Sequence, residues 1–142
     1  MGENEKKSIE NILLTELQPT QFYLSEEKIG NIKKWFNAAD LSGFEPLPVK
    51  FLNGKFILTD GHSRAWVAFC AGLVKLPLIW ESEDLDWKAY GKCVDACVAR
   101  GVNSISDFAG RILSKEDYKI QWNGWCDDLH AMLRKTEKTD ER

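Results

Sequence analysis

The sequence has no run of about 20 apolar residues, the length that a membrane-spanning helix requires. The segment from Met1 to Lys7 also lacks the apolar core of a secretory signal peptide. We therefore expect a cytoplasmic protein with no membrane partner.

An excess of positive charge is also missing. The chain has 19 Lys and Arg residues against 22 Asp and Glu residues, which gives a net charge of −3. Proteins that grip duplex DNA use Lys and Arg against its phosphates. The last predicted helix, after Ser114, would be the recognition helix of a helix-turn-helix, but carboxylates outnumber lysines along it. The charge pattern argues against direct binding of duplex DNA.

Cysteine is scarce, and none of the four cysteines forms a CxxC pair. Cys93 and Cys97 are four residues apart in a predicted helix, so both thiols would share one face. A zinc ion would need two further ligands, and His62 and His130 are distant in sequence. We expect small buried thiols and no metal site formed by protein side chains alone.

The 142 residues, 44% of them hydrophobic, suit a single domain with a real core. Apolar periodicity and turn residues predict a mixed α/β fold. We expect a strand-like segment at 12–17, a helix at 26–38, hairpin strands at 49–52 and 55–58, a helix at 62–71, a strand at 76–80, a helix at 84–100, a short helix from Ser104 or Ser106 to Leu113, and a last helix after Ser114.

Several residues mark the ends of these elements. Ser25 is a good helix N-cap, and Asn53-Gly54 favours a type I′ hairpin turn. Gly72 and Gly101 are suited to end the helices before them. The predicted organisation is an α/β core at 9–82, a helical C-terminal extension at 83–135 packed on it, and disordered tails at 1–8 and 136–142.

The most informative stretch runs from Lys55 to Ala68. It begins as a strand, with an apolar run at 56–58, and continues as a helix with an apolar face. Gly61 stands between the two, where the chain must bend sharply. The stretch therefore predicts a tight junction between a strand and the first turn of a helix.

Polar side chains crowd this junction. The unpaired N–H groups of a helix N-terminus attract anions. A hydroxyl at Ser63 and a guanidinium at Arg64 add donors suited to phosphate. The alternative is structural: Asp60 caps the helix and Arg64 forms a surface ion pair.

The strand followed by Asp60-Gly61-His62-Ser63-Arg64-Ala65 resembles the signature of the ParB/sulfiredoxin-like superfamily. The resemblance covers about Leu14 to Trp80. It implies a small mixed sheet with packed helices, and a nucleotide or another phosphate-containing small molecule bound at the junction. The phosphate-binding residues that it implies are Gly61, His62, Ser63 and Arg64.

Among the branches, D-G-H-x-R is most similar to the free-serine kinases, which use ADP or ATP. Sulfiredoxins carry a cysteine where this chain has His62, and partition ParB proteins carry an arginine cluster of which only Arg64 is present. The kinases use an acidic general base just after the first strand, and the matching residue here is Gln21, which cannot accept a proton.

The resemblance thus implies a Mg²⁺-dependent phosphotransferase using ATP or ADP. Asp60 would hold Mg²⁺ or act as the base, and Glu26 or Glu27 could replace the missing acid. His62 would be a second donor or an acid/base group, because a histidine changes charge near neutral pH. The alternative is a non-catalytic interaction or regulatory module that would act with DNA-associated partners.

Overall fold

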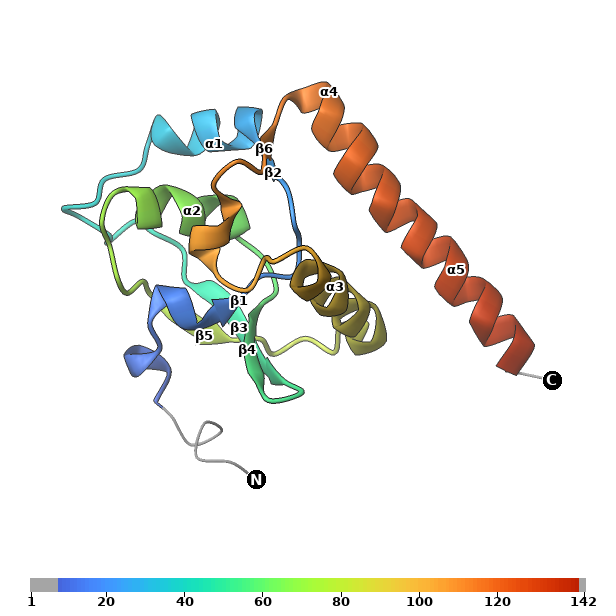
Figure 1. Ribbon diagram of the computed structural model, residues 1–142. Coiled ribbons are helices and arrows are strands. Elements are labelled where there is room, and N and C mark those ends of the chain that lie inside the picture. Colours follow the sequence, from blue (N-terminus) through green and yellow to red (C-terminus); the bar gives the residue numbers. More distant parts are fainter. Residues whose placement is uncertain (1–7, 141–142) are drawn as a thin grey trace.

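The computed structural model describes residues 8–140, with side chains described as far as Thr136 (Figure 1). The expected disordered segments at 1–7 and 141–142 lie outside the described residues. Residues 136–140, which we also expected to be disordered, form the end of a long helix.

The helices and strands follow one another in a mixed order. They are β1 (Leu17–Gln18), β2 (Leu24–Ser25), α1 (Glu26–Lys33), β3 (Leu47–Leu52), β4 (Lys55–Leu58), α2 (His62–Cys70), β5 (Leu78–Trp80), α3 (Trp87–Ala99), β6 (Ile112–Leu113), α4 (Lys115–Tyr118) and α5 (Gly124–Asp140). Short 3₁₀ turns lie at Ile9–Asn11, Leu14–Glu16 and Ile105–Phe108, and a π-helical turn at Lys119–Asn123 joins α4 to α5.

The main sheet has the strand order β1-β4-β3-β5. β4 is antiparallel to β3, while β1 is parallel to β4 and β5 is parallel to β3. The sheet is therefore mixed, which confirms the predicted fold class. The hairpin prediction is also confirmed: Asn53 and Gly54 both have positive φ, at 50° and 81°, as a type I′ turn requires.

Helices α1 and α2 pack on each other, with α2 between α1 and the main sheet (Figure 1). Helix α2 ends in a Schellman motif, in which Gly72 has φ +89° and Leu73 donates its N–H to the carbonyl of Ala68 at 3.1 Å. Helix α1 ends at Lys33 and not near residue 38 as predicted. Beyond it, the side chain of Asn37 accepts the N–H of Ala39, which is a turn that competes with the helix.

Two expectations about local structure are wrong. The region 12–17 consists mostly of 3₁₀ turns, and only Leu17 begins a strand. The short helix expected to reach Leu113 ends at Phe108, because Gly110 adopts φ +78° and turns the chain. The residues after it form β6, which pairs in parallel with β2 as a separate two-stranded sheet.

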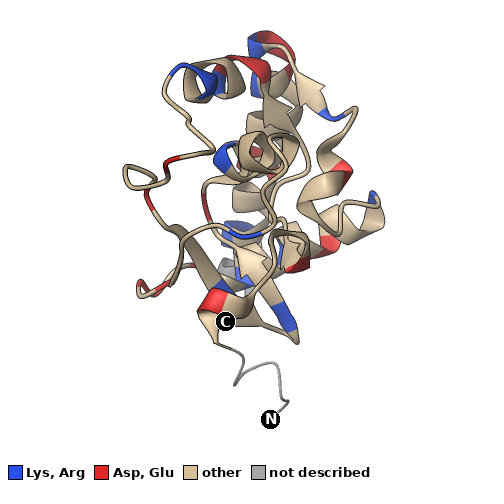
Figure 2. Cartoon of the chain, turned by 90° about the vertical axis from the view of Figure 1, so that its left-hand side faces the viewer, with Lys and Arg blue, Asp and Glu red and all other residues tan. Residues whose placement is uncertain are grey.

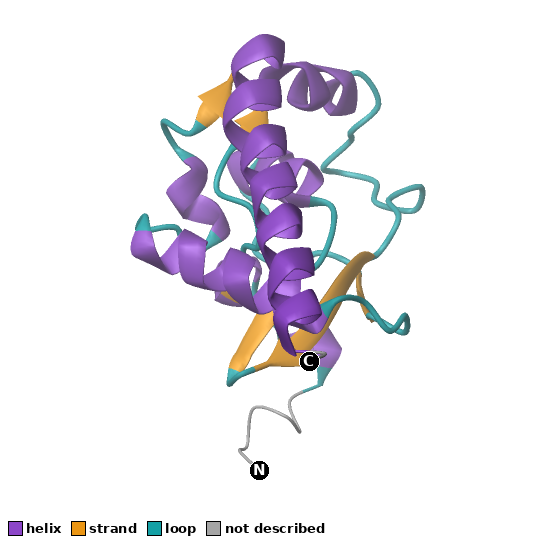
Figure 3. Cartoon of the chain, turned by 90° about the vertical axis from the view of Figure 1, so that its right-hand side faces the viewer, coloured by secondary structure: helices purple, strands orange, loops and turns teal. Residues whose placement is uncertain are grey.

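Helices α3 and α5 are in contact and cross each other on the outside of the molecule (Figures 1 and 3). Between them is a small apolar cluster of Ala89, Leu129 and Leu133. Most of the buried apolar residues belong to a larger cluster, to which the main sheet, α2, the segment around Phe22 and the turn at Ile105–Phe108 all contribute. Among the helices within residues 8–140, none is long and apolar enough to cross a membrane.

The bend between β4 and α2 is built around Gly61, which has φ +83°. A Cβ at this position would lie 2.5 Å from Cδ2 of Leu47 and 2.7 Å from Nη2 of Arg64. Both distances are far below van der Waals contact, so glycine is required here by backbone conformation and by space.

We expect Gly61→Ala to destabilise the fold more than Gly72→Ala. Both glycines have positive φ, so each alanine costs about 1–2 kcal/mol in backbone strain. A Cβ at Gly72 meets no atom within 4 Å, whereas at Gly61 it overlaps two side chains and costs about 1–3 kcal/mol more. Urea denaturation of the two variants measures the difference, and equal losses would contradict the close packing at Gly61.

Candidate functional site

The N-terminus of α2 is open. Gly61 is its N-cap residue and provides no side-chain cap, and Ala65 is the first residue to donate its N–H to a helical carbonyl, that of Gly61, at 2.9 Å. The N–H groups of His62, Ser63 and Arg64 precede that bond and have no intrahelical acceptor. Within the described residues, the carboxylate of Asp60 has no hydrogen-bond or ion-pair partner, so the structural alternative of an Asp60 cap does not hold.

Arg64 is held in place without being neutralised. Its Nη1 donates to the carbonyl of Glu45 at 2.8 Å, and its guanidinium lies over the ring of Phe44 at 5.6 Å. No carboxylate among residues 8–136 forms an ion pair with it. The expected surface ion pair is therefore absent, and the positive charge of Arg64 remains available beside Gly61.

A pocket of about 320 Å³ lies at this helix end. The junction lines one side of it, and the segment before β2 together with α1 lines the other. The lining residues are Gln21, Lys28, Asn31, Ile32, Asp60, Gly61, His62, Ser63 and Arg64. All five predicted site residues therefore meet in one pocket, which we call the junction pocket.

Helix α1 contributes Lys28 and Asn31, which the sequence analysis missed. These residues are three apart and so share one helix face, which is the sequence signal that could have identified them. The ammonium of Lys28 lies 5.0 Å from the centre of the Tyr118 ring and has no carboxylate partner among residues 8–136. Glu26 and Glu27 do not line the pocket, and Glu27 instead lies 3.5 Å from Lys115.

His62 is buried, with 3% of its surface exposed. Its Nε2 accepts the backbone N–H of Thr20 at 2.9 Å, and its ring meets the ring of Phe108 edge-on. Because Nε2 is the acceptor, the proton of the neutral ring is on Nδ1. Nδ1 has no hydrogen-bond partner among residues 8–136, and it is not fully covered, because no fully covered side-chain nitrogen or oxygen there lacks a partner.

Burial lowers the pKa of His62 to about 3. The prediction that this side chain changes charge near neutral pH is therefore wrong. In this fold His62 is a fixed neutral donor through Nδ1–H, and it cannot serve as a general acid or base at pH 7.

Gln21 lies beside His62. Its Nε2 donates to the carbonyl of Tyr23 at 2.9 Å and lies 3.4 Å from the hydroxyl of Tyr118. These contacts turn the amide nitrogen away from a ligand role and leave Oε1 as an acceptor. Asp60 is the remaining carboxylate in the junction pocket.

A second cavity, of about 250 Å³, adjoins the junction pocket, since Gln21 and His62 line both. We call it the helical cavity, because α3 and α5 with the π turn before it supply most of its wall. Those contributions are Asp86, Ala89, Tyr90, Cys93, Trp122, Cys126, Leu129 and His130. Sequence reasoning considered Cys93 and His130 only as metal ligands and gave the other residues no part in a site, because they are distant from Gly61 along the chain.

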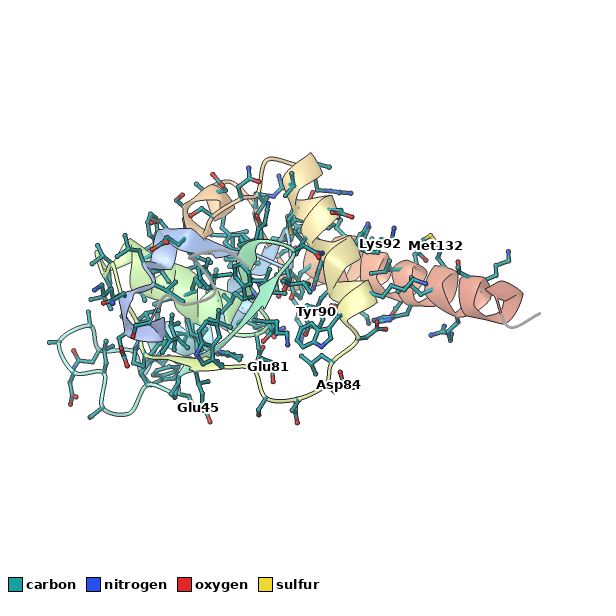
Figure 4. All side chains as sticks on the ribbon, turned by 90° about the horizontal axis from the view of Figure 1, so that it is seen from below. Glu45, Glu81, Asp84, Tyr90, Lys92 and Met132 are labelled. Atoms are coloured by element: carbon teal, nitrogen blue, oxygen red, sulfur yellow. The ribbon has the colours of Figure 1, made fainter. Side chains whose placement is uncertain are left out.

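Tyr90 lines the helical cavity and forms a hydrogen bond to Thr59, the residue before Asp60 of the junction pocket. It donates its hydroxyl to the carbonyl of Thr59 at 3.2 Å, and the hydroxyl of Thr59 donates to Glu81 at 2.8 Å. Burial raises the pKa of Tyr90, and the nearby Cys93, Asp60 and Glu81 raise it further. Figure 4 shows Tyr90 and Glu81 near each other below the sheet. The surroundings of the Tyr90 hydroxyl therefore carry negative charge from Asp60 and Glu81.

The cysteines do not form a metal site. Burial raises the pKa of Cys93 and Cys97 to about 12 and that of Cys126 to about 11, so the thiols stay protonated at neutral pH. Among the described residues there is no group of three His, Cys, Asp or Glu side chains that could hold a metal ion.

No family model, curated protein or solved structure matches this chain.

We expect stability to fall as the pH drops below 6.5. Between that value and about 3, residue 62 is protonated in the unfolded chain and neutral in the folded chain. Unfolding therefore takes up a proton, and stability falls by up to about 1.4 kcal/mol per pH unit. Denaturation midpoints measured from pH 7 to pH 4 test this, with His62→Gln expected to reduce the slope.

The same expectation can be checked by NMR. The ring protons of His62 should keep a constant chemical shift from pH 8 to pH 5. A titration midpoint near 6.5 would show that the imidazole is not buried against Thr20 and Phe108.

Proposed function

We propose that this chain is a ParB/sulfiredoxin-like domain that binds a nucleotide or another phosphate-containing small molecule in the junction pocket. One observation carries the proposal: Lys28 and Arg64, neither paired with a described carboxylate, meet the uncapped N-terminus of α2 at an open cavity. An anion there gains two charge-assisted contacts and unpaired backbone N–H groups.

The donors around the pocket fit a phosphate better than a carboxylate. A phosphate offers three or more acceptor oxygens, and the donors come from several directions. These are the ammonium of Lys28, the guanidinium of Arg64, the hydroxyl of Ser63 and the backbone of the first turn of α2. We assign the phosphates of the ligand to the junction pocket.

Duplex DNA is not the proposed ligand. The chain is acidic overall, and Figure 2 shows Lys and Arg interspersed with Asp and Glu on the side it displays, where they do not gather into one basic patch. A duplex needs a row of cations along its phosphates, whereas the junction pocket presents two beside a single helix end.

Mg²⁺ fits the site as a companion of the nucleotide. This ion is commonly held by one or two carboxylates together with substrate phosphates, and it retains several waters. Asp60 supplies one carboxylate at the pocket rim. Bound there, the ion would neutralise phosphate charge, and Asp60 would otherwise repel the ligand.

Two functions follow from this binding mode. As a phosphotransferase, the chain would use Asp60 as the base that takes the proton of an acceptor hydroxyl, because Gln21 and His62 cannot take it at pH 7. As a non-catalytic regulatory module, it would bind the nucleotide without turnover. The amide at Gln21, held by Tyr23, is the observation that favours the second function.

We expect Lys28→Ala to weaken the binding of pyrophosphate and ADP about tenfold, because one charge-assisted contact is lost. Lys33→Ala is the matched control, since Lys33 is exposed on the same helix and does not line the pocket. Calorimetry with ADP, ATP, CTP and pyrophosphate measures the affinities. Absence of binding by the unmodified chain would overturn the proposal.

Arg64→Ala should abolish detectable binding, and Arg64→Lys should retain part of it, because a lysine keeps the charge but loses the planar fork. Arg64 also bonds the carbonyl of Glu45, so the circular dichroism spectrum and the thermal midpoint of each variant must be compared. Loss of binding in Arg64→Ala with an intact fold supports the assignment.

Phosphate transfer from Mg²⁺-ATP to free serine separates the two functions. For a phosphotransferase we expect Gln21→Glu to raise the rate, since it adds a carboxylate next to Asp60, and Asp60→Asn to remove the remaining rate. Phosphoserine and ADP should form in equal amounts. Nucleotide binding with no product from the unmodified chain or from Gln21→Glu would select the non-catalytic module.

A further inference from the structure

We infer that the helical cavity holds the base of the nucleotide whose phosphates occupy the junction pocket, and that it selects bases carrying an exocyclic amine. This inference rests on the proposed function and extends it to ligand selectivity. The residues that carry it come from α3 and α5 with the preceding π turn, which lie in the predicted extension beyond residue 82.

The two cavities are placed for one ligand. They meet at Gln21 and His62, which line both, and their volumes of about 320 and 250 Å³ together fall within the range of small-molecule sites. A nucleotide has a charged end and a planar end separated by a sugar. The sugar would lie where the two cavities meet.

The linings differ in the way that such a ligand requires. In the junction pocket Ile32 is the sole large apolar side chain and there is no aromatic ring apart from the imidazole of His62. The helical cavity is lined by Tyr90, Trp122 and Leu129, which offer apolar and aromatic surface to a planar ring. The base therefore belongs in the helical cavity and the phosphates in the junction pocket.

His62 provides an independent sign of a ligand at the meeting point. Its ring is buried, its Nε2 accepts the N–H of Thr20, and its Nδ1–H is an unpaired donor that is not fully covered, on a residue that lines both cavities. A donor fixed in this way suits an acceptor on the ligand, such as a sugar hydroxyl or a phosphate oxygen. Because burial lowers the pKa of His62 to about 3, the ring is neutral at pH 7, so it would orient the ligand through a hydrogen bond and add no positive charge.

Two side chains of the helical cavity, Asp86 and Gln21, offer acceptor oxygens. The side chain of Asp86 caps α3 through one oxygen, at 3.0 Å from the N–H of Ala89, and its other oxygen has no described partner. Gln21 presents Oε1, because its nitrogen is bonded elsewhere. Asp60 and Glu81 add negative charge around Tyr90. An amine-bearing edge is attracted by these groups, whereas a carbonyl edge is repelled.

Cytosine and uracil provide the sharpest comparison, because the two rings have the same size and differ at one position by an amine or a carbonyl. We expect CDP to bind at least about tenfold more tightly than UDP and than pyrophosphate. Asp86→Asn keeps the helix cap, since asparagine caps as well as aspartate, and should reduce the CDP preference over UDP to below about threefold.

A second variant tests whether the base occupies the helical cavity. Cys126→Phe fills the helical cavity and should lower CDP affinity to that of pyrophosphate, while pyrophosphate affinity stays within about twofold of the unmodified chain. Met132→Phe is the control, because Met132 is exposed on the same helix and does not line the cavity. Figure 4 shows Met132 on the part of α5 that projects from the body of the molecule.

The outcomes are distinguishable. If pyrophosphate binds and both CDP and UDP bind no more tightly than pyrophosphate, the helical cavity does not hold the base, and the inference fails while the proposed function stands. Equal affinities for CDP and UDP, both above that of pyrophosphate, overturn the amine selectivity. If pyrophosphate and all the nucleotides fail to bind the unmodified chain, the proposed function itself fails.

Discussion

The close approach of Leu47 and Arg64 to the α-carbon of Gly61 is the constraint on which the site depends. Only three residues, Thr59 to Gly61, join β4 to α2, and the left-handed conformation of Gly61 turns the chain there, so the first turn of α2 lies close to the end of β4. The same packing holds the guanidinium of Arg64 across the bend, where the carbonyl of Glu45 fixes one of its arms. A larger residue at the bend would displace the cation and the helix end together.

Burial of His62 is the second element of this arrangement. Its bond to the N–H of Thr20 ties the first residue of α2 to the segment between β1 and β2, and Thr20 in turn donates its hydroxyl to the carbonyl of Leu58 at 2.8 Å. These contacts place Gln21 next to the bend. An uncharged imidazole suits this role, because a protonated ring could not accept the Thr20 N–H and would be costly to bury.

The sequence was most informative where local chemistry decides the structure. The Asn53-Gly54 turn, the Ser25 cap and the glycine after α2 are each determined by a few adjacent residues, and the structure has all three. The clustering of 60–64 around a helix end also followed from local pattern, because those residues are contiguous.

Features that depend on distant contacts could not be predicted in this way. The depressed pKa of His62 comes from burial under Phe108, far along the chain, and the helical cavity is assembled by α3 and α5. The pairing of β6 with β2 was missed for the same reason, since two-residue strands leave no periodic pattern to recognise.

The β2–β6 pair has a consequence for how the chain can be divided. Leu24 donates its N–H to the carbonyl of Arg111, Arg111 donates through Nε to the carbonyl of Phe22, and the ring of Phe22 packs edge-on against Trp122. A fragment truncated after residue 82 would expose that ring and orphan those backbone groups. The α/β core and its helical extension thus share backbone hydrogen bonds and one buried apolar cluster, so the boundary near residue 82 does not separate two independent cores.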